Sequence, residues 1–98
     1  MARYRRRSVD YPDANQKTIV EQLLDIPGVS VETGHDDILV GHRGRTYWYE
    51  IKNPEVANKD GKVFPSKIKP EQHRLNREFR GHYRIVTSFD EILEDMGL

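Results

Sequence analysis

The chain contains no cysteine, which excludes disulfides, thiolate metal sites and cysteine nucleophiles. It has no net charge either, because 16 Lys and Arg residues are matched by 16 Asp and Glu residues. No apolar run is long enough to cross a bilayer, and residues 1–10 lack the apolar core of a signal peptide. With 98 residues, 36% of them hydrophobic, we expect one small domain in a soluble, cytoplasmic setting.

Charge is nevertheless unevenly distributed along this neutral chain. The segment MARYRRR at residues 1–7 holds four arginines and no acid, and we interpret residues 1–11 as a flexible basic arm preceding a single domain at residues 12–98. Between Lys59 and Arg84, eight Lys and Arg residues stand against three acids. Such basic segments fit a phosphate-rich partner, but they equally fit a solvated surface and a frayed terminus.

The hydrophobic pattern and the turn residues predict an α/β domain. A helix capped by Asp13 is expected to run to about Asp25, and a second helix from Pro70 to about Arg80, with Gly81 ending it. Ser88 is expected to cap a short last helix, with Glu91 at the capping-box position. Strands are predicted at Val29–Thr33, Asp37–Gly41, Thr46–Lys52 and Tyr83–Thr87, and a polar loop at Asn53–Lys69. The resulting order is α-β-β-β-α-β-α.

The stretch YWYEIKN at residues 47–53 places Glu50 and Lys52 on one face of a strand that otherwise looks built for burial. A two-residue turn at Arg43-Gly44 would pair residues whose numbers sum to 87, which sets Asp37 directly opposite Glu50. Two like charges in that position destabilise a sheet unless a divalent cation bridges them. A slipped register, or a Glu50–Lys52 pair that only keeps an edge strand soluble, remains an alternative.

Two carboxylates and a backbone carbonyl, such as that of Ile51, form an oxygen site suited to Mg²⁺ or Mn²⁺. Mg²⁺ keeps several waters in so sparse a site, and one of them can serve as a nucleophile towards phosphate. Lys52 is placed to orient that water, to help deprotonate it or to offset transition-state charge. The residues alone therefore favour phosphodiester hydrolysis.

The same residues resemble a known signature. Asp37 followed by Glu50-Ile51-Lys52 is similar to the motif of the PD-(D/E)xK nuclease superfamily. More narrowly, the chain resembles the virus-type replication-repair nuclease (VRR-NUC) domain, whose phage-encoded members are small stand-alone chains. The resemblance covers roughly residues 13–95 and rests on Gly34-x-x-Asp37-Ile-Leu-Val, YEIKN, Pro70-Glu71-Gln72 and Val86-Thr-Ser-Phe-Asp-Glu-Ile-Leu93.

This resemblance implies a restriction-endonuclease-like core, a central mixed sheet flanked by helices, and Mg²⁺- or Mn²⁺-dependent cleavage of DNA by a homodimer. Asp37 and Glu50 would then be metal ligands and Lys52 the catalytic lysine, while Gln72 would order the site or contact phosphate. The chain departs from the family twice. First, Asp36 stands where the family usually has a proline before the first aspartate. Second, Gln16 occupies the position of the glutamate that the family commonly has on its first helix, while Glu21 falls on the polar edge of that helix. A second metal ion would therefore lack the carboxylate ligand that this glutamate provides.

Several other side chains are candidates for supporting roles. The four histidines (35, 42, 73 and 82) show no metal-ligand spacing and are expected on the surface or in loops. His35 is the exception, because it adjoins the proposed site and is a candidate for a supporting role there. Trp48 shares the face of Glu50; packing under a helix is the preferred reading, and stacking on a base or sugar is the alternative. Phosphate contacts are predicted at Arg43, Arg45, Lys67, Lys69, Arg74 and Arg77.

We therefore expect an endonuclease that acts on branched DNA, such as four-way (Holliday) junctions or flaps, and that recognises DNA shape rather than sequence, in a DNA-repair role. A homodimer is expected because symmetrical cutting needs two sites related by a twofold axis. Two other functions fit the same residues. One is a DNA-binding module that retains the fold without catalysis, and the other is an RNA-processing nuclease.

Overall fold

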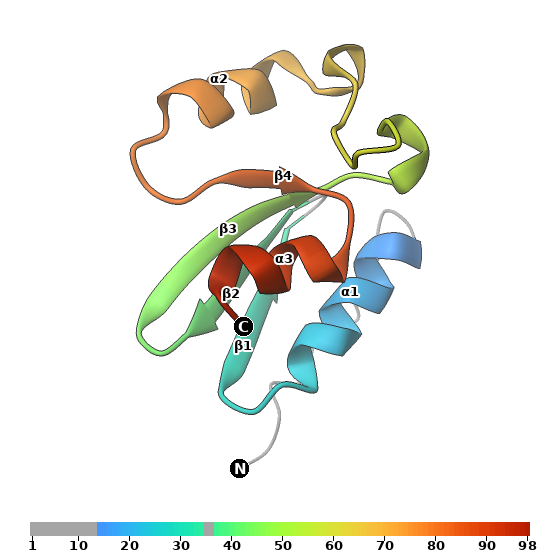
Figure 1. Cartoon of the computed structure of the whole chain (residues 1–98). Helices are drawn as coiled ribbons and strands as arrows, with labels where there is room; N and C mark the ends of the chain where they lie inside the picture. The colour runs from blue at the N-terminus through green and yellow to red at the C-terminus, as the bar shows by residue number, and fades with distance from the viewer. Residues whose placement is uncertain (1–13, 35–36) are drawn as a thin grey trace.

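The structure, a computed structural model, describes residues 14–34 and 37–98 and has the element order α-β-β-β-α-β-α (Figure 1). The order predicted from the sequence is confirmed. Two short 3₁₀ turns, each begun by a proline, interrupt the expected polar loop. The elements are α1 (Ala14–Leu24), β1 (Val29–Thr33), β2 (Asp37–His42), β3 (Arg45–Ile51), η1 (Pro54–Val56), η2 (Pro65–Lys67), α2 (Pro70–Glu78), β4 (Arg84–Val86) and α3 (Phe89–Met96).

The four strands form one mixed sheet in the order β1-β2-β3-β4. β1, β2 and β3 are antiparallel neighbours, and β4 pairs parallel to β3 after the chain has crossed over through α2. The hairpin between β2 and β3 turns at Arg43 and Gly44, both of which have positive φ, as a tight type I′ turn requires. The register predicted from that turn is confirmed, because Asp37 is the partner of Glu50 and Val40 the partner of Tyr47.

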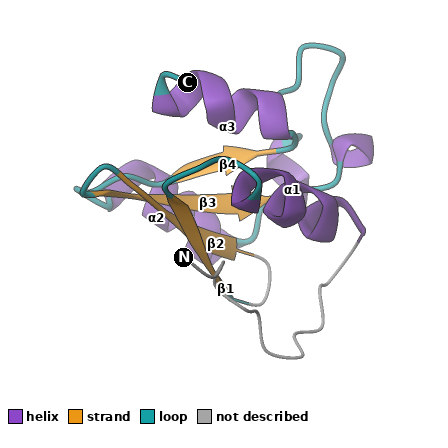
Figure 2. Cartoon of the chain, turned by 90° about the horizontal axis from the view of Figure 1, so that it is seen from below, coloured by secondary structure: helices purple, strands orange, loops and turns teal. Residues whose placement is uncertain are grey.

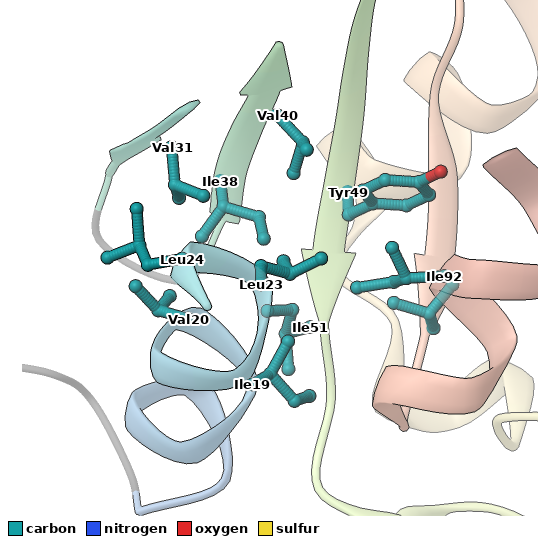
Figure 3. Packing of buried hydrophobic residues seen from close by; sticks show 11 residues of the cluster. Ile19, Val20, Leu23, Leu24, Val31, Ile38, Val40, Tyr49, Ile51 and Ile92 are labelled. Carbon is teal, nitrogen blue, oxygen red and sulfur yellow. The ribbon is translucent and has the colours of Figure 1, made fainter. Parts of the chain in front are cut away.

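The hydrophobic core lies between one face of the sheet and the helices α1 and α3, which lie side by side in Figures 1 and 2. Figure 1 shows α2 set apart from these two helices, beyond β4. Apolar residues of α1 meet alternate residues of the strands, which is how an amphipathic helix covers a sheet. Figure 3 shows this cluster, which includes Ile19, Val20, Leu23, Leu24, Val31, Ile38, Val40, Tyr49, Ile51 and Ile92.

Several predicted boundaries were wrong. β2 ends at His42 rather than at Gly41, β3 spans Arg45–Ile51 rather than Thr46–Lys52, and β4 ends at Val86 rather than at Thr87. Two further differences have a visible cause. The second helix ends at Glu78 rather than at Arg80, because Phe79 already has extended backbone angles (φ −66°, ψ 128°) while its N–H still bonds the carbonyl of Leu75. The last strand begins at Arg84 rather than at Tyr83. Ahead of it, the backbone N–H of Trp48 donates to the ring Nδ1 of His82 at 3.0 Å, so a side chain replaces the next rung of the ladder.

His82 also belongs to a partly buried polar network that ties α3 to the sheet. Asp95 of α3 accepts hydrogen bonds at 2.6 Å from the Tyr49 hydroxyl, from His82 Nε2 and from Arg84. His82 therefore carries its ring proton on Nε2, since Nδ1 accepts from Trp48. His82 does lie in a loop, as expected, but its role is to hold β3, β4 and α3 together.

Across the described ranges, no helix has both the length and the apolar character needed to cross a membrane. Asp13, the expected cap of the first helix, and the basic arm at residues 1–11 lie outside the described residues.

Candidate functional site

Asp37 and Glu50 face each other across the β2–β3 ladder. The side chains of Tyr49 and Ile51 point into the core (Figure 3), so those of Trp48 and Glu50, which alternate with them, project from the opposite face of the sheet. Glu50 is only 5% exposed, whereas Asp37 is partly exposed at the start of its strand. Directly opposed residues in an antiparallel ladder bring their Cβ atoms to roughly 4.5–5.5 Å. A buried carboxylate thus lies beside a second one.

Asp37 is held in place by two neighbours. The indole Nε1 of Trp48 donates a hydrogen bond of 2.6 Å to Asp37 Oδ2, and the backbone N–H of Gly34 donates one of 2.8 Å to the Asp37 carbonyl. A Cβ at position 34 would lie 2.2 Å from Asp37 Oδ1, so the carboxylate occupies space that only glycine leaves open. Trp48 was expected to pack under a helix or to stack on a ligand. Its hydrogen bond to Asp37 was not foreseen.

Lys52 directly follows the last residue of β3, next to the end of the parallel strand β4. Its N–H donates to the Val86 carbonyl at 2.8 Å. The side-chain amide of Asn15, in the first turn of α1, donates to the carbonyls of Lys52 (3.1 Å) and Thr87 (3.3 Å). Asn15 therefore fastens the helix to both strand ends. Sequence reasoning missed it, although its place one residue before the inward-facing Gln16 marks it as close to the sheet.

Gln16 is buried, at 1% exposure, and its Nε2 donates to the carbonyl of Asp37 at 3.3 Å. The inward position predicted for Gln16 is confirmed, and the residue lies against the chain segment that carries the first carboxylate. Glu21, by contrast, is exposed on the outer side of α1, as expected.

Tyr83 completes the group of side chains around the carboxylates. Burial raises the pKa of its hydroxyl, and the negative charges of Glu50 and Asp37 raise that pKa further. The hydroxyl oxygen is buried and lies close to the Glu50 carboxylate, which also raises this pKa by hydrogen bonding. The Tyr83 ring packs edge-to-face on Trp48, with centroids 4.8 Å apart. No sequence motif pointed to this residue.

Gln72 is buried in the first turn of α2 and accepts a hydrogen bond from the Lys69 N–H at 3.0 Å. Its amide oxygen thus satisfies a backbone donor at the start of the helix, half of a capping box. The catalytic or phosphate-contacting role expected for Gln72 stays a prediction.

The six basic residues predicted to contact phosphate are exposed but differ in their surroundings. Arg74 is paired with Glu71 and also lies 4.0 Å from Glu78, and Arg77 lies 2.9 Å from Glu78. The charges of these two arginines are therefore offset on their own helix. Arg43, Arg45, Lys67 and Lys69 are the other four.

A small oxygen-ligated cation fits the side chains present. No group of three or more His, Cys, Asp and Glu residues with metal-binding geometry occurs within residues 14–34 and 37–98, so any metal would rest on the Asp37 and Glu50 carboxylates with backbone oxygens such as that of Ile51. Mg²⁺ and Mn²⁺ accept such sparse ligation and complete their shells with water. His35 and Asp36, the predicted supporting residues, lie outside the described part of the chain.

An open cleft of about 790 Å³ lies between the loop that follows η1, α2 and β4. Ile85, the ladder partner of Glu50, contributes to its floor, so the cleft adjoins the strand that borders the carboxylates. Its lining includes Lys62, His73, Asn76 and Arg84 together with two acids, Asp60 and Glu91.

Searches for relatives returned nothing: no protein-family model, no curated protein and no solved structure matches this chain.

Proposed function

We propose that this chain is a metal-dependent endonuclease that hydrolyses phosphodiester bonds in branched DNA, with a PD-(D/E)xK nuclease core of the VRR-NUC type. The observation that carries the proposal is the pair Asp37 and Glu50, opposed in the ladder with Glu50 buried. Burying a carboxylate beside another is unfavourable unless a cation or protons compensate. Lys52 directly follows the last residue of the strand that carries Glu50, two positions along the chain from that carboxylate.

Each residue has a defined part in this mechanism. Asp37 and Glu50 would hold Mg²⁺ or Mn²⁺, which supplies a bound water of lowered pKa and stabilises charge on the phosphate. Trp48 fixes the Asp37 carboxylate by its hydrogen bond, and Lys52 orients the attacking water. As its oxygen bonds to phosphorus, the water gives up one proton. The bond from phosphorus to the leaving oxygen breaks and that oxygen takes up one proton from solvent, so one water is added across the P–O bond.

Lys52→Ala provides the first test. Labelled four-way junctions, flaps, linear duplex and matched RNA are incubated with the protein and Mg²⁺ or Mn²⁺. Wild type should cut a branched DNA, and Lys52→Ala should be slower by roughly 10²–10⁴-fold, the range typical of a group that manages a proton in the reaction. Lys17→Ala, on the exposed side of α1, is the matched control and should cut like wild type.

Equal cutting by Lys52→Ala and wild type would refute the mechanism. A protein that binds branched DNA without cutting it, and that gives no calorimetric Mn²⁺ signal sensitive to Glu50→Ala, would be a binding module instead. Preferential cutting of RNA would redirect the proposal to an RNA-processing nuclease. The dimer is tested separately by light scattering, where the expected mass is twice the 11.5 kDa of one chain.

A further inference from the structure

Phe79, at the end of α2, is an aromatic side chain held in a fixed position yet left open to solvent. Its ring packs edge-on against Trp48, with centroids 5.2 Å apart and an interplanar angle of 90°. It also lies over Gly81, where a Cβ would come within 2.6 Å of Phe79 Cε2. Even so, 45% of the residue remains exposed. Contacts on two sides thus fix the ring while much of it faces solvent.

The position of this ring connects it to the carboxylates. Trp48, which Phe79 contacts, donates the 2.6 Å hydrogen bond to Asp37. Trp48 also packs edge-to-face on the buried ring of Tyr83, with centroids 4.8 Å apart. Phe79 is therefore the solvent-facing end of an aromatic cluster (Trp48, Phe79 and Tyr83) whose inner end touches the candidate metal ligands.

We propose that Phe79 is a stacking platform for an unpaired DNA base next to the phosphate that is cut. The inference rests on the proposed function and adds the form of the substrate. A phosphate bound at the Asp37–Glu50 pair would lie beside Trp48, which donates to Asp37 and contacts Phe79 on its other side. Bases within a duplex already stack on one another, whereas an unpaired base offers a free face. A branch point or a flap supplies such a base.

Phe64 provides a comparison within the same chain. It has the same exposed fraction, 45%, but it precedes η2 and lies outside the aromatic cluster. If exposed phenylalanine promotes DNA binding merely by being apolar, substitution of either residue should have the same effect. If position beside the carboxylates matters, only Phe79 should contribute.

The experiment measures binding without relying on cleavage. Flap DNA carries 2-aminopurine at the first unpaired position, and Ca²⁺ replaces Mg²⁺. The fluorescence of this base falls when it stacks on an aromatic ring. Wild type should quench it, and Phe79→Ala should lose the quenching and bind the flap about 5- to 150-fold more weakly. Phe79→Trp should restore both, while Phe64→Ala should match wild type.

A fully paired duplex of the same length serves as the second substrate, and Phe79→Ala should bind it as wild type does. The inference is overturned if Phe79→Ala quenches and binds the flap like wild type, or if Phe64→Ala shows the same loss. It is also overturned if Phe79→Ala halves the mass seen by light scattering, since the ring would then serve a contact between copies. If the wild-type protein quenches the fluorescence but cuts no substrate, the proposed hydrolysis is refuted while the stacking of an unpaired base on Phe79 is supported.

Discussion

The position of the Asp37 carboxylate depends on two single residues, the glycine at 34 and the indole of Trp48. One leaves space beside Oδ1, and the other binds Oδ2. Neighbours that orient a metal ligand in this way commonly change metal affinity by 10- to 100-fold when they are altered. Geometry at the candidate site is therefore set by residues that need not touch a metal themselves.

Gly34→Ala tests this dependence directly. The new Cβ would lie 2.2 Å from Asp37 Oδ1, and the carboxylate, being the end of a flexible side chain, should rotate away. We expect the affinity for Mn²⁺, measured by calorimetry, to fall roughly 10- to 100-fold. Global stability should change by less than about 1 kcal/mol, because no backbone atom is displaced.

Gly41→Ala is the matched control for that substitution. Gly41 lies on β2, and a Cβ there would meet the side-chain Oγ of Ser30 at 2.8 Å, a contact of the same kind away from the carboxylates. Its Mn²⁺ affinity should equal that of wild type. An unchanged affinity in Gly34→Ala would show that the glycine does not determine the position of the carboxylate.

Among the elements, the β2–β3 hairpin was the most predictable part of the fold. A two-residue turn fixes the register arithmetically, which placed Asp37 opposite Glu50. The same arithmetic puts Trp48 diagonal to Asp37, but whether an indole N–H reaches a carboxylate depends on side-chain torsions that a residue pattern does not encode. The start of β4 was mispredicted for a related reason, since His82 bonds β3 through its ring.

The anchoring of α3 could not be predicted either, because Tyr49, His82 and Asp95 are far apart in the sequence. In the fold they converge on one carboxylate. Burial works to raise the pKa of Asp95, but the hydrogen bonds from Tyr49 and His82 and the charge of Arg84 outweigh it and lower the pKa below its ordinary 3.8. A carboxyl with a lowered folded-state pKa stabilises the fold above its unfolded-state pKa, and this contribution disappears as the pH falls through the folded-state value.

Asp95→Asn should therefore destabilise the protein in a pH-dependent way. At pH 7 we expect a loss of roughly 1–3 kcal/mol, since hydrogen bonds to a charged acceptor are lost. The difference from wild type should shrink as the pH falls below about 4 and the wild-type carboxyl is protonated. Urea denaturation between pH 7 and pH 3 measures it, with the exposed Glu94→Gln as control. If the difference in the free energy of unfolding between Asp95→Asn and wild type stays constant with pH, the lowered pKa inferred for Asp95 is contradicted.

At the scale of the whole molecule, ion pairs on the surface reduce the basic excess that the count of Lys and Arg residues indicated. The excess of bases between Lys59 and Arg84 suggested a basic flank, but Arg74 and Arg77 lie against Glu71 and Glu78. Arg45 and Lys67 are exposed and form no ion pair within the two described ranges. A linear sequence does not show which charges neutralise each other, so the phosphate contacts could only be predicted as a group.

Two double variants separate these classes of basic residue. Each phosphate contact that is lost should lower the slope of log K against log salt by about 0.9 on duplex DNA. Arg45→Gln with Lys67→Gln should therefore reduce the slope by about 1.8. Arg74→Gln with Arg77→Gln removes the same formal charge, but it should reduce the slope by less than half as much, because Glu71 and Glu78 already offset those arginines. Binding of branched DNA in Ca²⁺ between 50 and about 200 mM salt measures both slopes.

Two outcomes would contradict this prediction. Equal reductions would mean that DNA displaces Glu71 and Glu78 and contacts all four basic residues. A larger reduction in the Arg74 and Arg77 double variant would place the DNA backbone along α2.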